Sequence, residues 1–244
     1  MNHPYSHLLQ PLQVGSLTFK SRMISSPTSL PELGPNGKLT PANIAYYEQR
    51  AKGGCACVTV GESIVEIATG RSHPLQIPLD DPDVCTGLTQ VADAIHAHGA
   101  YASIELSHGG SLCEPALIGG RNAMGASTYI DRCGDPIIAM TEEDIEHITE
   151  KFAQAALLVK KCGFDMCMVH GGHGWLLHQF LSPLTNFRTD RFGGSLENRM
   201  RFSMMVIDRI RQYCGRNFPI EFRMSGDEFV EGGYHLDEGV KIAQ

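Results

Sequence analysis

The distribution of apolar and polar residues along the chain predicts a repeated alternation of short strands and longer helices. Strands are expected at five apolar stretches, residues 22–27, 55–62, 101–106, 164–169 and 218–224. Each is followed by a segment with apolar residues at helical spacing, as in Val84, Leu88, Val91 and Ile95. Five successive strand–helix units indicate a parallel sheet joined by right-handed crossovers.

Capping residues mark where the predicted helices begin. Thr40 followed by Pro41 is a helix start signal, and Thr141 with Asp144 has the pattern of a capping box. Ser195 precedes a further amphipathic stretch and is expected to cap it. The strands themselves read as apolar throughout rather than alternating, which is expected when helices cover both faces of a sheet.

Two architectures fit this alternation, a doubly wound open sheet and a (β/α)8 TIM barrel. The first strand leads into TSLPELGPNGKL, which lacks the G-x-G-x-x-G turn of a nucleotide-binding open sheet. Polar residues gather instead at the carboxyl ends of the strands, in SPTS, GES, ELSHGG, HGGHGW and RMSGDE. Because catalytic residues of TIM barrels lie at these ends, the pattern favours an α/β TIM barrel. The chain stops at Gln244 inside its fifth helix, so we expect residues 1–244 to form one barrel domain, truncated after about five units.

Composition narrows the classes of protein to which the chain can belong. Of its 244 residues 42% are hydrophobic, and the formal net charge is −7. The sequence has no run of apolar residues long enough to span a membrane, no secretory signal and no basic block. We therefore expect a cytoplasmic protein with no nucleic acid or membrane partner. Eight cysteines occur without a Cys-x-x-Cys pair, so reduced, structural thiols are expected and no metal site is predicted.

Five motifs spread along the whole chain resemble the Old Yellow Enzyme family, the FMN-dependent ene-reductases. They are KSRMISSPTS, YYEQRAKGG, IELSHGG, HGGHGWLLHQFLSPLTNFRTDRFGGSLENRMRF and FRMSGDEF. The chain is most similar to the long bacterial branch that includes 2,4-dienoyl-CoA reductase and clostridial enoate reductases. The resemblance implies a TIM barrel with FMN at the carboxyl ends of its strands and NAD(P)H as reductant. In that branch a 4Fe–4S cluster and an FAD-binding domain would follow, so an isolated N-terminal part is expected to be inactive.

Two histidines, His170 and His173, follow the fourth strand among glycines. Two neutral imidazoles can each donate one N–H to a carbonyl oxygen, and such fixed donors stabilise a developing enolate. The resemblance assigns this pair to the carbonyl of an α,β-unsaturated substrate, whose C=C receives hydride from flavin N5. Both residues are therefore predicted to be catalytic.

Trp175 departs from the family pattern and is predicted to contact the substrate. The family usually has a tyrosine here, which donates a proton to the α-carbon. An indole N–H cannot act as that acid at ordinary pH, although it can donate a hydrogen bond. The proton is then expected from water, from a histidine, or from a tyrosine such as Tyr129 or Tyr46.

The resemblance also predicts the residues that bind the flavin. They are Pro27, Thr28, Ser29, Gly61, Glu62, Glu105 and Arg223. Ser29 is expected to hydrogen-bond flavin O4, and Arg223 is expected to stabilise the reduced, anionic ring. Glu105 stands where the family typically has Gln. An ionised carboxylate can accept from the ring N–H but cannot donate to a ring carbonyl, so this position puts flavin affinity and potential in question.

The remaining polar residues have a simpler expected role. Five residues of NFRTDRFGGSLENR are predicted to hold the fourth loop together by hydrogen bonds, namely Asn186, Arg188, Asp190, Asn198 and Arg199. His108, Asp227 and Glu228 also lie at strand ends, but nothing in their spacing predicts a metal site.

Three functions are compatible with these residues, and the first is the one that we predict. The first is ene reduction of a small α,β-unsaturated carbonyl compound by a protein that forms a homo-oligomer. The second is amine or N-methyl oxidation in the same fold, which the histidine pair disfavours. The third is a flavin-free interaction or folding fragment.

Overall fold

The fold is described from a computed structural model that covers residues 5–30 and 32–244. Its centre is a sheet of five parallel strands in the order β12-β11-β7-β4-β3. These strands are β3 (Ile24–Ser25), β4 (Cys57–Val60), β7 (Tyr101–Leu106), β11 (Met166–Gly171) and β12 (Ile220–Met224). Each new strand is added at the same edge, so the sheet curls as five consecutive strands of a TIM barrel do.

All five predicted strands are confirmed, although their bounds differ. The first strand was expected to span residues 22–27, but β3 has only two residues because it lies at an edge and pairs with β4 alone. At the opposite edge, every residue of β12 is half-buried, whereas every residue of β11 is buried. Burial therefore rises from the edges to the middle of the sheet.

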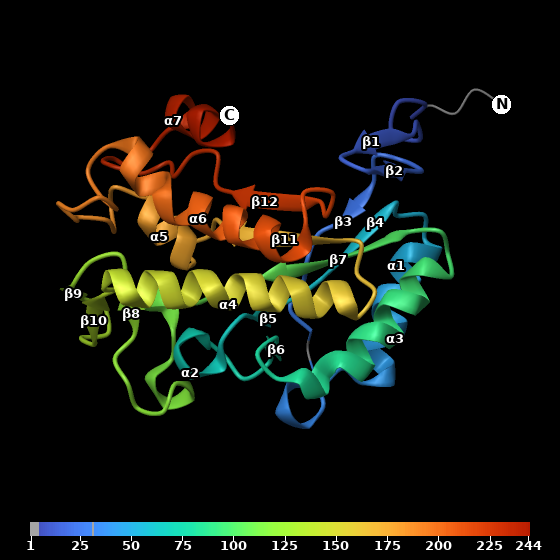
Figure 1. Cartoon of the computed structure of the whole chain (residues 1–244), viewed down its shortest axis with the longest axis horizontal. Coiled ribbons are helices and arrows are strands. Elements are labelled where there is room, and N and C mark those ends of the chain that lie inside the picture. The colour runs from blue at the N-terminus through green and yellow to red at the C-terminus, as the bar shows by residue number, and fades with distance from the viewer. Residues whose placement is uncertain (1–4, 31) are drawn as a thin grey trace.

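The helices that connect the strands also follow the prediction. They are α1 (Pro41–Lys52), α3 (Cys85–His96), α4 (Glu142–Lys161), α6 (Leu196–Cys214) and α7 (Leu236–Ala243). Thr40 and Thr141 form capping boxes, and Ser195 caps α6 by accepting from the amide of Asn198. Figure 1 shows α4 along the front of the molecule with α6 beside it, and α1 packs against α3.

The two faces of the sheet differ in chemistry, which corrects the expectation of uniformly apolar strands. Residues on the outer face, such as Val60, Ile104 and Val169, join the main apolar core beneath the helices. In-register residues on the other face include Ser103 beside Met166 and Glu105 beside Met168. The alternation exists because the inner face of a barrel leads to the site at the strand ends, where polar groups are needed.

Several elements were not predicted from the sequence. They are β1 (Leu12–Val14), β2 (Leu17–Phe19), β5 (Ser63–Ile64), β6 (Ile77–Pro78), β8 (Met124–Gly125), β9 (Tyr129–Ile130), β10 (Pro136–Ala139), α2 (Ile67–Gly70) and α5 (Leu176–Leu181). The hairpin β1-β2 contributes Phe19 to a small cluster with Ala56, Cys57 and Met166 at the amino ends of the strands. The segment between β7 and α4 forms the small sheet β8-β10-β9 on the opposite side, near the carboxyl ends.

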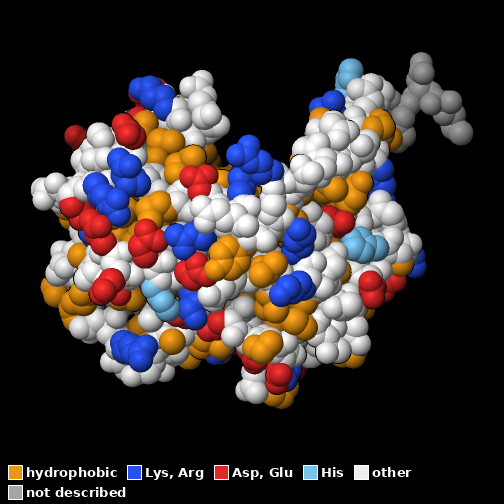
Figure 2. Space-filling view, viewed as in Figure 1, with side chains coloured by type: hydrophobic (Ala, Val, Ile, Leu, Met, Phe, Trp, Pro, Cys, Tyr) orange, Lys and Arg blue, Asp and Glu red, His pale blue; other side chains and the backbone are white. Residues whose placement is uncertain are grey.

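The surface agrees with the compositional expectations. Figure 2 shows basic and acidic side chains interspersed over the face that carries α4 and α6. Across the described ranges no helix has the length and apolarity needed to cross a membrane. The cysteines are free thiols, and Cys133 is exposed because it lies on the turn between β9 and β10.

Candidate active site

The pairing of the strands brings the predicted catalytic and flavin-binding residues to one end of the sheet. His170 on β11 is in register with Arg223 on β12, and Met168 on β11 is in register with Glu105 on β7. Gly61 follows directly after β4. Because in-register residues of parallel strands point to the same face, these side chains share the inner face of the sheet.

The histidine pair is brought together by an unusual backbone after β11. His173 has a φ of 57°, a left-handed conformation that is uncommon for a residue with a side chain. Glycines make the approach to it possible. A Cβ atom on Gly171 would lie 2.3 Å from the ring of Phe222, and one on Gly172 would lie 3.2 Å from the backbone nitrogen of Ser225. The glycines therefore let the chain cross the end of β12 closely before it presents the second imidazole.

The two imidazoles converge on one point. Nε2 of His170 lies 3.3 Å from Nδ1 of His173, and the ring centroids are 5.1 Å apart. An oxygen atom placed about 2.9 Å from both nitrogens would complete a triangle with this pair. The two nitrogens are themselves within hydrogen-bond distance, so one ring donates to the other in this structure. A carbonyl oxygen that replaces this contact can accept from each ring when both facing nitrogens carry a proton.

The surroundings of both histidines favour the neutral imidazole. Burial, followed by the neighbouring His173 and Arg223, lowers the pKa of His170 to about 3. Burial and Arg223 also lower the pKa of His173. Nδ1 of His170 is buried without a partner in the described part of the chain. An imidazole that stays neutral keeps one N–H as a donor, which is the state that carbonyl binding requires.

Trp175 lies beside this pair, half-buried at the start of α5. Its ring stands edge-on to His170, with centroids 5.7 Å apart. The two tyrosines that were considered as proton donors lie in different places. The hydroxyl of Tyr46 accepts a hydrogen bond from Arg50, whereas Tyr129 lines a cavity of about 570 Å³ together with Gly174.

At the neighbouring strand ends the residues predicted to bind flavin are packed tightly. A Cβ atom on Gly61 would lie 2.7 Å from Cβ of Pro27 and 3.1 Å from Oε2 of Glu105. The Tyr47 hydroxyl, which sequence reasoning missed, donates to the Gly61 carbonyl at 2.5 Å and accepts from its amide. The motif YYEQRAKGG contains this tyrosine, but only the fold reveals what it holds.

The side chain of Glu62 is committed to a hydrogen-bond network. Its carboxylate accepts from the hydroxyl of Ser29 at 2.6 Å, contacts Nε2 of His73 at 2.9 Å and accepts from Gln76 at 2.8 Å. Ser29 therefore already uses the hydroxyl proton that was predicted to reach flavin O4. Thr28 is exposed, and its hydroxyl contacts the carbonyl oxygen of Ser26 at 3.4 Å.

The flavin end of the site holds two polar side chains without partners. Glu105 is only 5% exposed, and the residues described show no hydrogen bond to its carboxyl. Arg223 is half-buried and forms no ion pair within residues 5–30 and 32–244. An FMN ring, with its N–H and carbonyl edge, would supply what both groups lack, so this part of the site fits the cofactor that the sequence implies.

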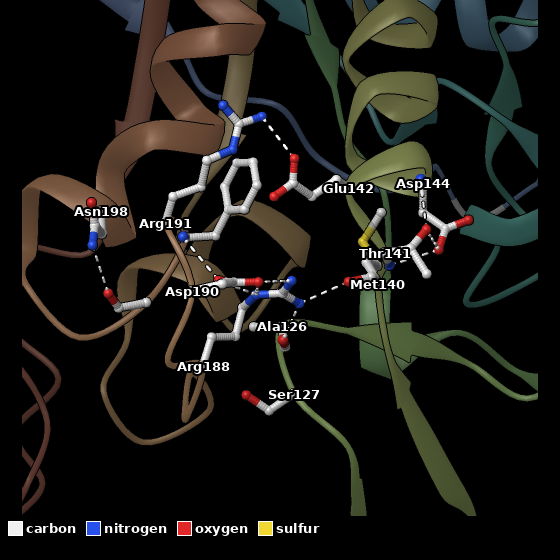
Figure 3. A network of polar contacts seen from close by, with 12 residues as sticks. Ala126, Ser127, Met140, Thr141, Glu142, Asp144, Arg188, Asp190, Arg191 and Asn198 are labelled. Atoms are coloured by element: carbon white, nitrogen blue, oxygen red, sulfur yellow. Dashed lines mark hydrogen bonds and ion pairs between the residues drawn. The ribbon is translucent and has the colours of Figure 1, made fainter.

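Residues beyond the strand ends hold the fourth loop in place, as predicted. Arg188 forms a double hydrogen bond with Asp190 and donates to the carbonyl oxygens of Ala126 and Met140 (Figure 3). Four further contacts tie this loop together. Asn186 donates to the carbonyls of Phe180 and Phe192, Asn198 to that of Gly193, and Arg199 to that of Leu181.

Other polar residues near the site have structural partners. His108 is buried, its Nδ1 accepts from the amide of Gly110, and burial lowers its pKa to about 4. Asp227 accepts from the amide of Phe229, and Glu228 accepts from the amide of Tyr234. No group of three or more potential metal ligands occurs among the residues that the structure describes.

Comparison with known proteins identifies relatives along the entire chain. Residues 7–243 match the model of the NADH:flavin oxidoreductase / NADH oxidase family. The NADPH dehydrogenase of Halalkalibacterium halodurans is 40% identical over 95% of this chain and 67% of its own length. The NADH oxidase of Thermoanaerobacter brockii is 35% identical over 100% of this chain. This chain spans only 38% of that relative.

Solved structures show the same relationship. A 2-naphthoyl-CoA reductase complex superposes with a TM-score of 0.91 at 30% identity, over 98% of this chain and 38% of the other. Histamine dehydrogenase from Rhizobium sp. 4-9 gives 0.89 at 28% identity, over 99% and 35%. Old Yellow Enzyme from Pichia sp. AKU4542 gives 0.85 at 27% identity, over 95% and 62%. The chain belongs to the NADH:flavin oxidoreductase / NADH oxidase family, the Old Yellow Enzyme family, and its sheet is part of that family's TIM barrel.

Proposed function

We propose that this protein is an FMN-dependent ene-reductase, which reduces the C=C bond of a small α,β-unsaturated carbonyl compound at the expense of NAD(P)H. The observation that carries the proposal is the convergence of two neutral imidazoles on one point, with Nε2 of His170 and Nδ1 of His173 3.3 Å apart. The membership of this chain in a flavin oxidoreductase family supports the proposal, because FMN, when bound, supplies the hydride for the β-carbon.

The histidines would bind and polarise the substrate carbonyl. Each ring donates one N–H, and both donors strengthen as negative charge develops on the oxygen. Since the rings are fixed on β11 and on the tight turn behind it, little reorganisation is needed during the reaction. Removing one donor of this kind typically costs about 10²–10³ in rate.

Protonation of the α-carbon needs a separate group, because Trp175 carries no acidic proton. Tyr129 is the better candidate of the two tyrosines, since it lines the same cavity as Gly174, which directly precedes Trp175. The hydroxyl of Tyr46 is occupied by Arg50. Trp175 itself would bound the substrate pocket through its edge-on contact with His170.

Amine oxidation is the competing reaction, and it has support in the similarity to histamine dehydrogenase. An amine substrate offers no carbonyl oxygen, so the convergence of two N–H donors would have no partner in that reaction. The histidine pair therefore favours reduction of an activated alkene.

The test uses the protein in its complete, natively expressed form, purified without oxygen. Its flavin spectrum is recorded, the flavin is bleached with NADH or NADPH, and reoxidation by enones, enoates and enoyl thioesters is followed. We expect reoxidation by an activated alkene, with loss of that activity in the variant His170→Ala/His173→Ala. The variant His98→Ala serves as a control, because His98 pairs with Glu48 and contacts none of the residues proposed for the site. Bleaching by amines, with no reoxidation by any alkene, would contradict the proposal.

A further inference from the structure

The carboxyl group of Glu105 is a nearly buried polar group at the strand ends. It is 5% exposed, and the described residues offer it no hydrogen bond or ion pair. Its Oε2 would lie 3.1 Å from a Cβ atom on Gly61, which Pro27 approaches as well, and the apolar residue Met168 is in register with it on β11. A carboxylate left ionised in such surroundings would be costly, whereas a neutral carboxylic acid would not.

The charges that face Glu105 come from three elements. Glu62, just after β4, repels its ionised form, and Arg223 on β12 attracts it. Tyr47 on α1 is uncharged, because burial raises its own pKa. Burial is the largest influence on Glu105, and together with Glu62 it raises the pKa of this carboxyl to about 8. The acid form is therefore the resting form at neutral pH.

We propose that Glu105 binds the flavin as a neutral carboxylic acid, donating its O–H to a ring carbonyl while its second oxygen accepts from the ring N–H. This inference rests on the proposed function for the presence of the flavin. A carboxylic acid offers one donor and one acceptor side by side, as a primary amide does, so it matches a ring edge that alternates N–H and C=O. The ionised group offers two acceptors and would face the ring carbonyl with a lone pair.

Flavin affinity must then depend on pH. The fraction of Glu105 in its acid form falls from about nine tenths at pH 7 to about one tenth at pH 9, and the apparent dissociation constant rises by the inverse of that fraction. We expect FMN to bind about tenfold more weakly at pH 9 than at pH 7. Covering the carboxyl with the flavin ring excludes further water, which acts in the same direction.

The experiment titrates the flavin-free protein with FMN, and separately with riboflavin, between pH 6 and pH 9, following flavin fluorescence. In Glu105→Gln the amide replaces the acid, and the affinity should no longer change across this range. In Glu62→Gln the repulsion of the carboxylate is reduced, so the loss of affinity should begin at a lower pH. Glu197→Gln is the matched control, because the Glu197 side chain is 87% exposed, and it should behave as the wild type does. An infrared band of a protonated carboxyl that is lost only in Glu105→Gln would give a second readout.

Each result decides between the two proposals. An affinity that falls above pH 8 in the wild type and stays constant in Glu105→Gln supports the neutral acid. Flavin binding with the same pH dependence in both proteins, or with none in the wild type, would overturn the role of Glu105 and leave the proposed function standing. Absence of flavin binding by every variant at every pH would instead contradict the proposed function and, with it, this inference.

Discussion

The two ends of the candidate site reach the same electrical state from opposite directions. At the carbonyl end, burial lowers the pKa of His170 to about 3, so a base that is ordinarily half-charged near pH 6.5 becomes neutral. At the flavin end, burial raises the pKa of Glu105 to about 8, so an acid that is ordinarily charged becomes neutral as well. One cause, the removal of water, leaves uncharged hydrogen-bond donors at both ends.

The two ends differ in the neighbouring charge that opposes ionisation. His170 and His173 contact each other at 3.3 Å. A positive charge on either ring would be repelled by Arg223, which lowers the pKa of both. A proton lost from Glu105 would create a charge close to that of Glu62. Arg223 contributes a positive charge that attracts the ionised form of Glu105. The site thus combines neutral donors with one fixed positive charge where an anionic ring would need it.

The largest effect should come from removing the donors at the carbonyl end. In His170→Ala/His173→Ala we expect kcat/KM for an enone to fall by about 10³ or more, since each lost donor is worth about 10²–10³. The measurement is reoxidation of the reduced flavin by the enone. Flavin binding at pH 7 should stay intact, because neither histidine is proposed to hold the cofactor. A loss of less than tenfold would mean that the carbonyl is bound elsewhere.

A second large effect concerns stability at the flavin end. Because the pKa of folded Glu105 is about 8 and an unfolded Glu titrates near 4.3, folding favours the protonated form. The free energy of unfolding should therefore decline as pH rises from about 4.5 to 8. Glu105→Gln removes this penalty and should stabilise the flavin-free protein by roughly 2–4 kcal/mol at pH 7.5 but not at pH 4.5. The measurement is denaturant unfolding of both proteins at both pH values. If Glu105 were charged in the folded state as it is in the unfolded state, the difference in free energy of unfolding between wild type and Glu105→Gln would be the same at both.

Much of the fold could be predicted from the sequence because its signals are local. Apolar runs set the five strands, and capping residues such as Thr40 and Thr141 set where helices begin. The short elements between β7 and α4 gave no such signal, since β8 and β9 have two residues each and depend on pairing with β10. The hairpin β1-β2 is missed for a related reason. Its apolar residues are few, and their partners Ala56 and Met166 are distant in the chain.

The sequence could predict which residues lie together at the strand ends, but not the electrostatics of those residues. The residues at the strand ends follow from the motifs and from the topology of parallel strands. The sequence could not show that the Ser29 hydroxyl donates a hydrogen bond to Glu62. Nor could it show that the Tyr47 hydroxyl bonds both the carbonyl and the amide of Gly61. It raised the question of an ionised Glu105, and only the burial of that carboxyl shows why the group is neutral. Burial depends on the packing of β7 against both of its neighbours, β4 and β11.

A moderate effect should follow from adding a proton donor to the carbonyl end. Trp175→Tyr introduces a hydroxyl beside His170, where the indole ring now stands edge-on at 5.7 Å. If protonation of the α-carbon limits turnover, we expect kcat to rise about tenfold, a fraction of what a well-placed general acid contributes. Tyr129→Phe in the wild type should lower kcat, and the same change in Trp175→Tyr should matter less. Equal losses in both backgrounds would exclude Tyr129 as the donor.

The smallest effect, and the sharpest test of the comparison, is the pH dependence of the reaction. A histidine with the ordinary pKa of about 6.5 would be roughly nine tenths charged at pH 5.5. Because burial lowers the pKa of His170 to about 3, His170 should remain neutral as pH falls, and burial with Arg223 moves the pKa of His173 in the same direction. We expect the rate of reoxidation by an enone, with flavin saturating, to change less than about threefold between pH 8 and pH 5.5.

Flavin affinity, in contrast, should weaken on the alkaline side through Glu105. The acidic range therefore reports on the histidines, and the alkaline range reports on the carboxyl group. A change of tenfold or more in reoxidation rate near pH 6.5, absent from His173→Ala, would show that His173 titrates in the ordinary range. The carbonyl end would then be charged in mild acid, and only the flavin end would be neutral through burial. The charge would lie on His173, which is at the surface, whereas His170 is 4% exposed.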